Sequence, residues 1–204
     1  PQHVFLMMGL HPCYVKENWK DELKIVEEWL SKRKFAAIGE VGLDFYWDRT
    51  FEQQQYEAFR IQIEWALQYK LPIVIHTRNA IQETIDIVKE YIGKKLHGIF
   101  HCFGGSYENA LDIINAGFYL GIGGVLTYKN TGLSEVLKKI PIENIVLETD
   151  APYLPPVPFR GKRNESSYLK YVVDKLAEIY NISREEIAAI TTANAERIFA
   201  SVDH

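Results

Sequence analysis

The sequence has 204 residues, of which 47% are hydrophobic and 25% are charged, so it is long enough and apolar enough for a globular protein with a core of normal size. A net charge of −4 excludes a uniformly basic nucleic-acid-binding protein, and any polyanion must be bound by a local patch or by a metal. Two cysteines are too few for a disulfide framework, and no apolar run approaches the roughly 18 residues of a membrane span. We therefore expect a cytoplasmic protein without membrane contact.

Strand-like runs and amphipathic helices alternate along the chain. The six predicted strands are Val4–Leu10, Ala36–Ile38, Pro72–His76, Gly98–His101, Phe118–Gly124 and Asn144–Leu147. Apolar residues at helical spacing predict seven helices, over Trp19–Leu30, Tyr56–Leu67, Ile81–Ile92, Ser106–Gly117, Leu133–Ile140, Leu169–Ile179 and Ser183–Phe199. The first strand is continuously apolar, as expected of a strand buried on both faces. This alternation predicts one α/β domain over residues 1–204 with a parallel sheet.

Residue types that bind metals or protons lie at or just after the carboxyl ends of five of the predicted strands. These residues are His11, Glu40, His76, His101 and Asp150. Only a closed barrel brings five strand ends together, which favours a TIM-type (β/α)8 barrel over an open sheet. Six strands are fewer than the eight of such a barrel. We therefore expect that upstream residues, about two strand-helix units, are absent from the sequence as given.

The segment of residues 35–44 is the centre of the predicted site. Gly39 and Gly42 flank Glu40, and so little side-chain bulk would let the carboxylate approach a metal, a phosphate or another strand. Taken alone, this short pattern fits a turn with an exposed glutamate equally well. The ligand-type residues that follow the later strands favour the functional interpretation.

Two carboxylates and two imidazoles fit divalent cations such as Zn, Mn, Co or Ni, or Mg where carboxylate and water dominate. Two such cations about 3.5–4 Å apart can bind the attacking and leaving oxygens of a phosphodiester. Asp150 could then accept a proton from water, or could simply open a turn. His76 alone would more often be a core histidine. Asp44 could orient a ligand or shape a turn.

Two groups of basic residues could bind phosphate. Arg78 follows His76 by two residues, so both side chains leave the strand on the same side. Arg160, Lys162 and Arg163 follow the last strand and would give an acidic protein a local cationic rim. The alternative for this second group is an ordinary solvated loop.

The motifs at these positions are similar to those of the TatD family of metal-dependent hydrolases and deoxyribonucleases, in the wider amidohydrolase-like group. They occur in the family's order from about residue 8 to residue 199 and are specific as a set. The motifs are Gly9-Leu10-His11-Pro12, Gly39-Glu40-Val41-Gly42-Leu43-Asp44, Pro72-Ile73-Val74-Ile75-His76-Thr77-Arg78, His101-Cys102-Phe103, Leu147-Glu148-Thr149-Asp150-Ala151-Pro152-Tyr153-Leu154, Arg160-Gly161-Lys162-Arg163-Asn164 and Asn194-Ala195-Glu196-Arg197-Ile198-Phe199.

This resemblance implies a TIM barrel with two divalent cations (Mg, Mn or Zn) that hydrolyses DNA. It implies that Glu40 bridges the cations, that His76 and His101 hold one of them, and that Asp150 contacts the other and activates water. His11 and Arg78 would line the substrate site. The main departure from the family is that the sequence contains no His-x-His pair of the kind that ends the family's first strand; smaller ones are Gly104-Gly105 after the His101 motif and Ser166 where a Pro is common.

We therefore predict a metal-dependent phosphodiesterase that acts on single-stranded DNA or 3′ ends, as a monomer, with Glu40 and Asp150 as catalytic residues. Arg160, Lys162 and Arg163 would join His11 and Arg78 in binding substrate. Two alternatives remain: a hydrolase of small amides or esters on the same metal site, and a non-catalytic barrel that only binds. No lysine follows a strand as a carbamylated metal ligand would, which disfavours the first, and four retained ligand residues disfavour the second.

Overall fold

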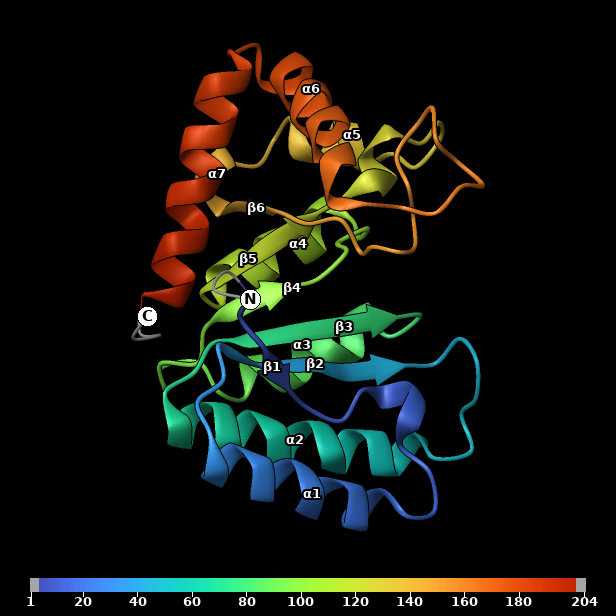
Figure 1. Cartoon of the computed structure of the whole chain (residues 1–204), viewed down its shortest axis with the longest axis vertical. Helices are drawn as coiled ribbons and strands as arrows, with labels where there is room; N and C mark the ends of the chain where they lie inside the picture. The colour runs from blue at the N-terminus through green and yellow to red at the C-terminus, as the bar shows by residue number, and fades with distance from the viewer. Residues whose placement is uncertain (1–3, 201–204) are drawn as a thin grey trace. The chain divides into compact units, whose positions relative to one another are not determined.

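The computed structural model describes residues 4–200, and the chain divides into two compact units. Residues 1–99 with 198–204 belong to the first unit, and residues 100–197 belong to the second. Figure 1 shows the helices and strands of each unit along the chain. Among the described residues, no helix is both long enough and apolar enough to cross a membrane.

The first unit is built from strands that alternate with helices, as the sequence predicts. Strands β1 and β2, and β2 and β3, pair in parallel. Helices α1 and α2 lie side by side along these strands (Figure 1). The elements are β1 (Met7–Met8), a 3-10 turn η1 (Pro12–Tyr14), α1 (Trp19–Lys32), β2 (Ala37–Asp44), α2 (Glu52–Tyr69), β3 (Ile73–Arg78), α3 (Ile81–Lys89) and β4 (Gly98–Phe100), which ends at the boundary of the unit.

Strand β2 carries the core of the first unit. Its side chains are buried on both faces, as expected of a parallel strand covered by helices, and Glu40 is the exception among its eight residues. Helix α2 packs against it, and Phe59 and Ile63 of this helix are 1% and 0% exposed. The Glu40 side chain is 31% exposed, so its carboxylate contributes little to this packing, which points to a role outside the core.

The first predicted strand is much shorter than expected. Strand β1 covers only Met7–Met8, and the side chains of Val4, Phe5 and Leu6 are exposed. The prediction of a strand from Val4 to Leu10 that is buried on both faces was therefore wrong. Among the described residues β1 pairs with β2 alone, so it has a hydrogen-bonded neighbour on one side where a central strand has two.

The second unit continues the alternation. Strands β5 and β6 pair in parallel, with Leu120 opposite Ile145 and Ile122 opposite Leu147. The elements are α4 (Tyr107–Asn115), β5 (Phe118–Ile122), η2 (Gly124–Thr127), α5 (Leu133–Leu137), η3 (Ile142–Asn144), β6 (Ile145–Leu147), η4 (Ser166–Tyr168), α6 (Leu169–Tyr180) and α7 (Arg184–Phe199), whose last two residues are assigned to the first unit. The predicted fifth strand was two residues too long, because Gly123 and Gly124 turn the chain into η2.

Side-chain caps begin two helices of this unit. Ser106 accepts a hydrogen bond from the Asn109 N–H at the start of α4, and Ser183 accepts one from Glu186 at the start of α7. Helix α7 is tied to β6 by Asn194, whose fully buried side-chain amide donates to the carbonyls of Ile142 and Ile145 at 3.0 and 2.8 Å. These bonds fix the point at which β6 begins and therefore help to place the carboxylates that follow it.

Candidate metal centre

Glu40 projects from an irregularity in β2 and not from a loop after it. Ile38 lies opposite Ile73 of β3, and Val41 lies opposite Ile75, so three steps along β2 match two along β3. One extra residue of this kind is a β-bulge, which bends the strand and re-aims a side chain. The prediction that the strand ends at Ile38 and runs into a loop was therefore wrong. The strand continues to Asp44, and the bulge breaks the alternation at Glu40.

Gly42 explains why the strands can approach so closely here. Its φ is +140°, and a Cβ at this position would lie 2.0 Å from the carbonyl oxygen of His76 on β3. Any larger residue would push the two strands apart. The sequence left open whether this glycine-flanked segment approaches a metal, a phosphate or another strand. In the structure, Gly42 lies against another strand, β3.

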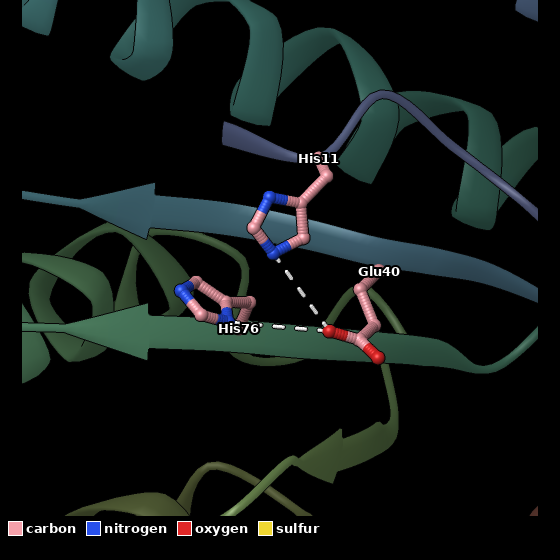
Figure 2. A group of neighbouring side chains, drawn as sticks. All are labelled: His11, Glu40 and His76. Carbon is pink, nitrogen blue, oxygen red and sulfur yellow. Dashed lines mark ion pairs between the residues drawn. The ribbon is translucent and has the colours of Figure 1, made fainter. Parts of the chain in front are cut away.

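His11, Glu40 and His76 converge in the first unit. Figure 2 shows both imidazole rings pointing toward the carboxylate of Glu40. The Glu40 Oε2 atom is 3.8 Å from His11 Nε2 and 4.0 Å from His76 Nδ1, and the two rings are 4.4 Å apart. Each residue offers one ligand atom, and these three atoms all lie within 4.8 Å of one another. We call these residues the first-unit cluster.

Asp44 holds one ring of this cluster in place. Its Oδ2 atom is 2.9 Å from His76 Nε2, and its Oδ1 accepts the Tyr46 N–H at 3.0 Å. Burial tends to raise the pKa of Asp44, but hydrogen bonds from His76, the Tyr46 N–H and Cys13 outweigh it and lower the pKa. If His76 binds a cation, a hydrogen bond from its Nε2 to the ionised Asp44 would leave the lone pair on Nδ1, toward Glu40. Asp44 thus contacts both the ring of a predicted ligand, His76, and the backbone of the chain that follows β2.

His11 is oriented by the backbone. Its Nδ1 accepts a hydrogen bond from the Cys13 N–H at 3.2 Å, so Nε2 faces Glu40. The sequence predicted that His11 lines the substrate site, and its position beside two predicted metal ligands also makes it a possible third ligand. Two imidazoles with one carboxylate are a typical ligand set for zinc and similar cations.

A second cluster forms in the second unit, from His101 after β4 and two carboxylates after β6. His101 Nδ1 is 2.9 Å from Glu148 Oε2, and His101 Nε2 is 3.6 Å from Asp150 Oδ1. The other oxygen of Glu148 accepts the Cys102 N–H at 2.7 Å. We call His101, Glu148 and Asp150 the second-unit cluster. Glu148 was not predicted as a site residue, although an acidic residue directly after β6 was a signal that could have found it.

Asn164 shapes the turn that carries Asp150. Asp150 has a φ of +52°, and Asn164 is 2% exposed. The Asn164 side-chain amide donates to the carbonyl oxygens of Thr149 and Tyr153, on either side of the turn. The backbone N–H of Asn164 also donates to Pro152 at 3.0 Å. Asn164 ends the basic motif and was not singled out from the sequence, because its partners lie 11 and 15 residues away.

The predicted phosphate-binding basic residues are exposed, and two of the arginines lie against aromatic rings. The guanidinium of Arg78 is 3.6 Å from the centre of the Tyr46 ring, and that of Arg160 is 4.2 Å from the Tyr128 ring. Lys162 and Arg163 lie on the same exposed loop as Arg160. A guanidinium that lies over an aromatic ring still has N–H groups pointing outward from its edge. These groups can donate hydrogen bonds to a phosphate.

The donor atoms of the first-unit cluster suit a divalent cation, because one ligand atom from each of its residues lies within 4.8 Å of the others. His76 and His101 each have one ring nitrogen beside an orienting carboxylate and the other toward a second carboxylate, an arrangement common among metal-binding histidines. All four predicted ligands are partly accessible, with side-chain exposures of 31% for Glu40, 18% for His76, 11% for His101 and 27% for Asp150. They are therefore accessible enough to exchange a cation, and buried enough to keep their orientation.

Comparison with known proteins identifies the chain's relatives. Residues 1–200 match the family model described as TatD related DNase. The chain is 44% identical over 197 residues to the uncharacterized metal-dependent hydrolase YabD of Bacillus subtilis, covering 96% of this chain and 77% of that protein. The chain belongs to the TatD family.

The relatives of this TatD protein include solved structures and a named nuclease. The crystal structure of YJJV, a TatD homologue from Escherichia coli K12, superposes with a TM-score of 0.91 at 29% identity, covering 98% of this chain and 78% of that one. The 3′-5′ ssDNA/RNA exonuclease TatD of Citrobacter rodentium is 32% identical over 203 residues, which is 97% of this chain and 77% of that protein. The predicted family and the predicted α/β barrel class are confirmed, and the chain is a metal-dependent hydrolase.

Proposed function

We propose that this TatD protein is a deoxyribonuclease that hydrolyses phosphodiester bonds of single-stranded DNA from the 3′ end. The observation that carries the proposal is the first-unit cluster, in which His11, Glu40 and His76 direct ligand atoms to one point while Asp44 holds His76. The family description and the name of the Citrobacter rodentium relative support DNA as the substrate. The exposed basic loop supports a polyanionic substrate in an otherwise acidic protein.

The proposed cation ligands are Glu40 and His76 from the first unit, and His101 and Asp150 from the second. A pair of divalent cations, Mg, Mn or Zn, would supply Lewis acidity to the scissile phosphate and lower the pKa of a nucleophilic water. The four side chains would set the positions of the cations. Glu40, which has two carboxylate oxygens and a side chain that is 31% exposed, is the residue that we propose would be shared by both cations.

The protein's own groups would do the rest of the reaction. Asp150 Oδ1, which lies 3.6 Å from His101 Nε2, is the proposed acceptor for the water proton. Glu148 would keep the His101 ring aimed at Asp150 through the bond to Nδ1. Arg78, Arg160, Lys162 and Arg163 would bind phosphates along the strand, and His11 would lie beside the scissile group.

The test is cleavage of a 5′-fluorescent single strand of DNA with Mg, Mn or Zn, followed on a denaturing gel. We expect a ladder that shortens from the 3′ end and disappears with a chelator. Glu40→Gln should lower the rate at least about a hundredfold, because a lost ligand costs no less than a lost ligand-orienting group. Glu83→Gln, on an exposed position of α3, is the matched control and should leave the rate unchanged.

Two results would overturn the proposal. One is a rate that survives both the chelator and Glu40→Gln, because a contaminating nuclease would then be responsible. The other is metal-dependent hydrolysis of small esters or amides with no cleavage of DNA, which would make the chain a small-molecule hydrolase on the same ligands.

A further inference from the structure

Two large aromatic side chains project from the loop that follows β2. The Tyr46 side chain is 49% exposed and the Trp47 side chain is 71% exposed. Their rings meet edge to face with centres 4.7 Å apart. Exposing so much aromatic surface at neighbouring positions forgoes burial that would stabilise the fold, so a contact with a ligand is a reasonable cause.

Arg78 completes this surface. Its guanidinium is 3.6 Å from the Tyr46 ring centre and 5.2 Å from that of Trp47. Arg78 lies opposite Asp44 in the pairing of β2 with β3, and its carbonyl accepts the Phe45 N–H at 2.9 Å. The cation is therefore held at the base of the aromatic loop by the strands themselves. We call Tyr46, Trp47 and Arg78 the stacking platform.

The loop is fixed although its rings are exposed. Asp48 accepts hydrogen bonds from Lys16 and from the Thr50 N–H, both at 2.9 Å, and Arg49 binds Glu52. A hollow of about 250 Å³ adjoins Trp47, and Lys16 is among the residues that line it. A loop braced in this way presents its rings at a small cost in conformational entropy, as a preformed binding surface requires.

The stacking platform is linked to the first-unit cluster through Asp44. One oxygen of this carboxylate accepts the Tyr46 N–H, while the other binds the ring of His76. A ligand on the platform therefore lies within a few residues of the predicted cation ligands. The chemistry that fits is a flat π-surface with an anionic group beside it, because rings stack on bases and the guanidinium edge binds phosphate.

We propose that the stacking platform binds an unpaired base of single-stranded DNA next to the first-unit cluster, and so selects single strands over duplexes. This inference rests on the proposed function. Bases in a duplex are already stacked on their neighbours, whereas an unpaired base can stack on Tyr46 or Trp47 without losing a partner. Every base has a π-face, so the platform selects the single-stranded state and not the sequence.

The experiment measures binding without cleavage. Fluorescence anisotropy of a labelled single strand, and of the same sequence as a blunt duplex, is recorded with chelator present and at fixed salt. Trp47→Ala should weaken single-strand binding about tenfold, as loss of one base stack does, and leave duplex binding unchanged. Trp47→Phe, which keeps a ring, should restore most of the affinity. Arg78→Lys, which keeps the charge, should still weaken binding.

Trp29→Ala is the matched control, because Trp29 is also exposed, at 46%, and also has a cation near its ring, but lies on helix α1. It should change neither affinity. A second probe is a DNA strand whose 3′-terminal nucleotides lack bases. The unchanged protein should bind this strand about tenfold more weakly than the complete strand. The Trp47→Ala protein should bind the two strands equally well. That pairing separates stacking from phosphate contacts.

Equal single-strand affinity of the unchanged protein and Trp47→Ala would overturn the inference. So would a Trp47→Ala protein that binds DNA normally but has lost self-association in sedimentation, because the rings would then serve a protein interface. Failure of the proposed function is a separate result, since metal-dependent cleavage is read on the gel and binding is read in chelator.

Discussion

Beside the first-unit cluster, the carboxylate of Asp44 binds His76 at Nε2. In the second-unit cluster, the carboxylate of Glu148 binds His101 at Nδ1. Each ring thus offers its other nitrogen to a second carboxylate, Glu40 or Asp150. The orienting carboxylates differ in their surroundings. Asp44 is 2% exposed at the end of a strand, and the Glu148 side chain is 18% exposed after one.

This difference indicates that the two clusters are held by different means. The first depends on strand pairing, because the β2 bulge aims Glu40, and Asp44 lies where the backbone of β2 ends. The second depends on a turn, because the bonds from Asn164 hold the chain around Asp150. A buried orienting group has no water to replace it when it is removed, so disturbing Asp44 should cost more than disturbing Glu148.

The largest effect is expected for Asp44→Asn. The new amide can donate a hydrogen bond to His76 Nε2, which would favour the tautomer with its proton on Nδ1. Nδ1 would then have no lone pair for a cation. Removal of such a ligand-orienting group costs about 10- to 100-fold in metal affinity, and burial places this case near 100-fold, or about 2.7 kcal/mol. Calorimetric titration with Mn²⁺ gives the affinity. Asp86→Asn, an exposed change on α3, should have no effect, and equal affinities for both variants would contradict the prediction.

The sequence pointed to most of the residues that the structure brings into the two clusters, because positions at the ends of strands are a local pattern. The ends of Ala36–Ile38, Pro72–His76 and Gly98–His101 place Glu40, His76 and His101 without knowledge of any partner. It could not show the bulge at Glu40, because a bulge is defined by the register of β2 against β3, a non-local property. The length of β1 was missed for the same reason, since burial of Val4–Leu10 depends on what covers it.

The orienting residues were harder to find than the ligands. Glu148 and Asn164 each act through two side-chain hydrogen bonds. The fold of the second unit sets the partners, which are His101 and Cys102 for Glu148 and Thr149 and Tyr153 for Asn164. Nothing in a sequence says which nitrogen of His101 faces which carboxylate. The assignment of all 204 residues to one catalytic domain, and the roles of the four ligands, remain predictions that the experiments address.

The second largest effect is expected for Asn164→Asp, which breaks the turn of the second-unit cluster. The change removes both amide donors and sets a carboxylate against two carbonyl oxygens in a site that is 2% exposed. Leaving such buried groups unpaired costs about 2 kcal/mol. Urea unfolding should show that loss, and DNA cleavage should fall because Asp150 moves. Asn115→Asp, exposed at the end of α4, is the matched control. Unaltered stability and rate would show that the turn holds without Asn164.

The third prediction uses Glu148→Gln as the counterpart of Asp44→Asn. The same chemical change is made to the orienting carboxylate of the other cluster, where solvent can take part of its role. We expect about a tenfold loss of metal affinity or cleavage rate, equivalent to about 1.4 kcal/mol. A loss as large as that of Asp44→Asn would remove the proposed distinction between a strand-held and a turn-held cluster.

The smallest effect is expected for Tyr180→Phe, which changes the stability of the second unit without touching its cluster. The Tyr180 hydroxyl donates to the carbonyls of Leu137 and Ile140 at 2.9 and 2.8 Å. At neutral pH its loss should cost about 1 kcal/mol, or about 2–4 °C in Tm, with metal affinity unchanged. A parallel loss of metal affinity would show that the cluster depends on the packing of α5 and α6.

Alkaline pH sharpens this last test. Burial, with a smaller contribution from Glu143, raises the pKa of Tyr180 far above its ordinary value of 10.0. The unfolded chain therefore loses this proton first, so the stability that Tyr180 contributes is complete below about pH 10 and falls as pH rises above it, by up to about 1.4 kcal/mol per pH unit. Unfolding by urea at pH 8, 10 and 11 should show a shallower alkaline decline for Tyr180→Phe than for the unchanged protein. Tyr153 is 69% exposed, so the stability of Tyr153→Phe should fall with pH as that of the unchanged protein does. If the stability of all three proteins falls with pH in parallel, burial of the Tyr180 hydroxyl makes no difference and the prediction is wrong.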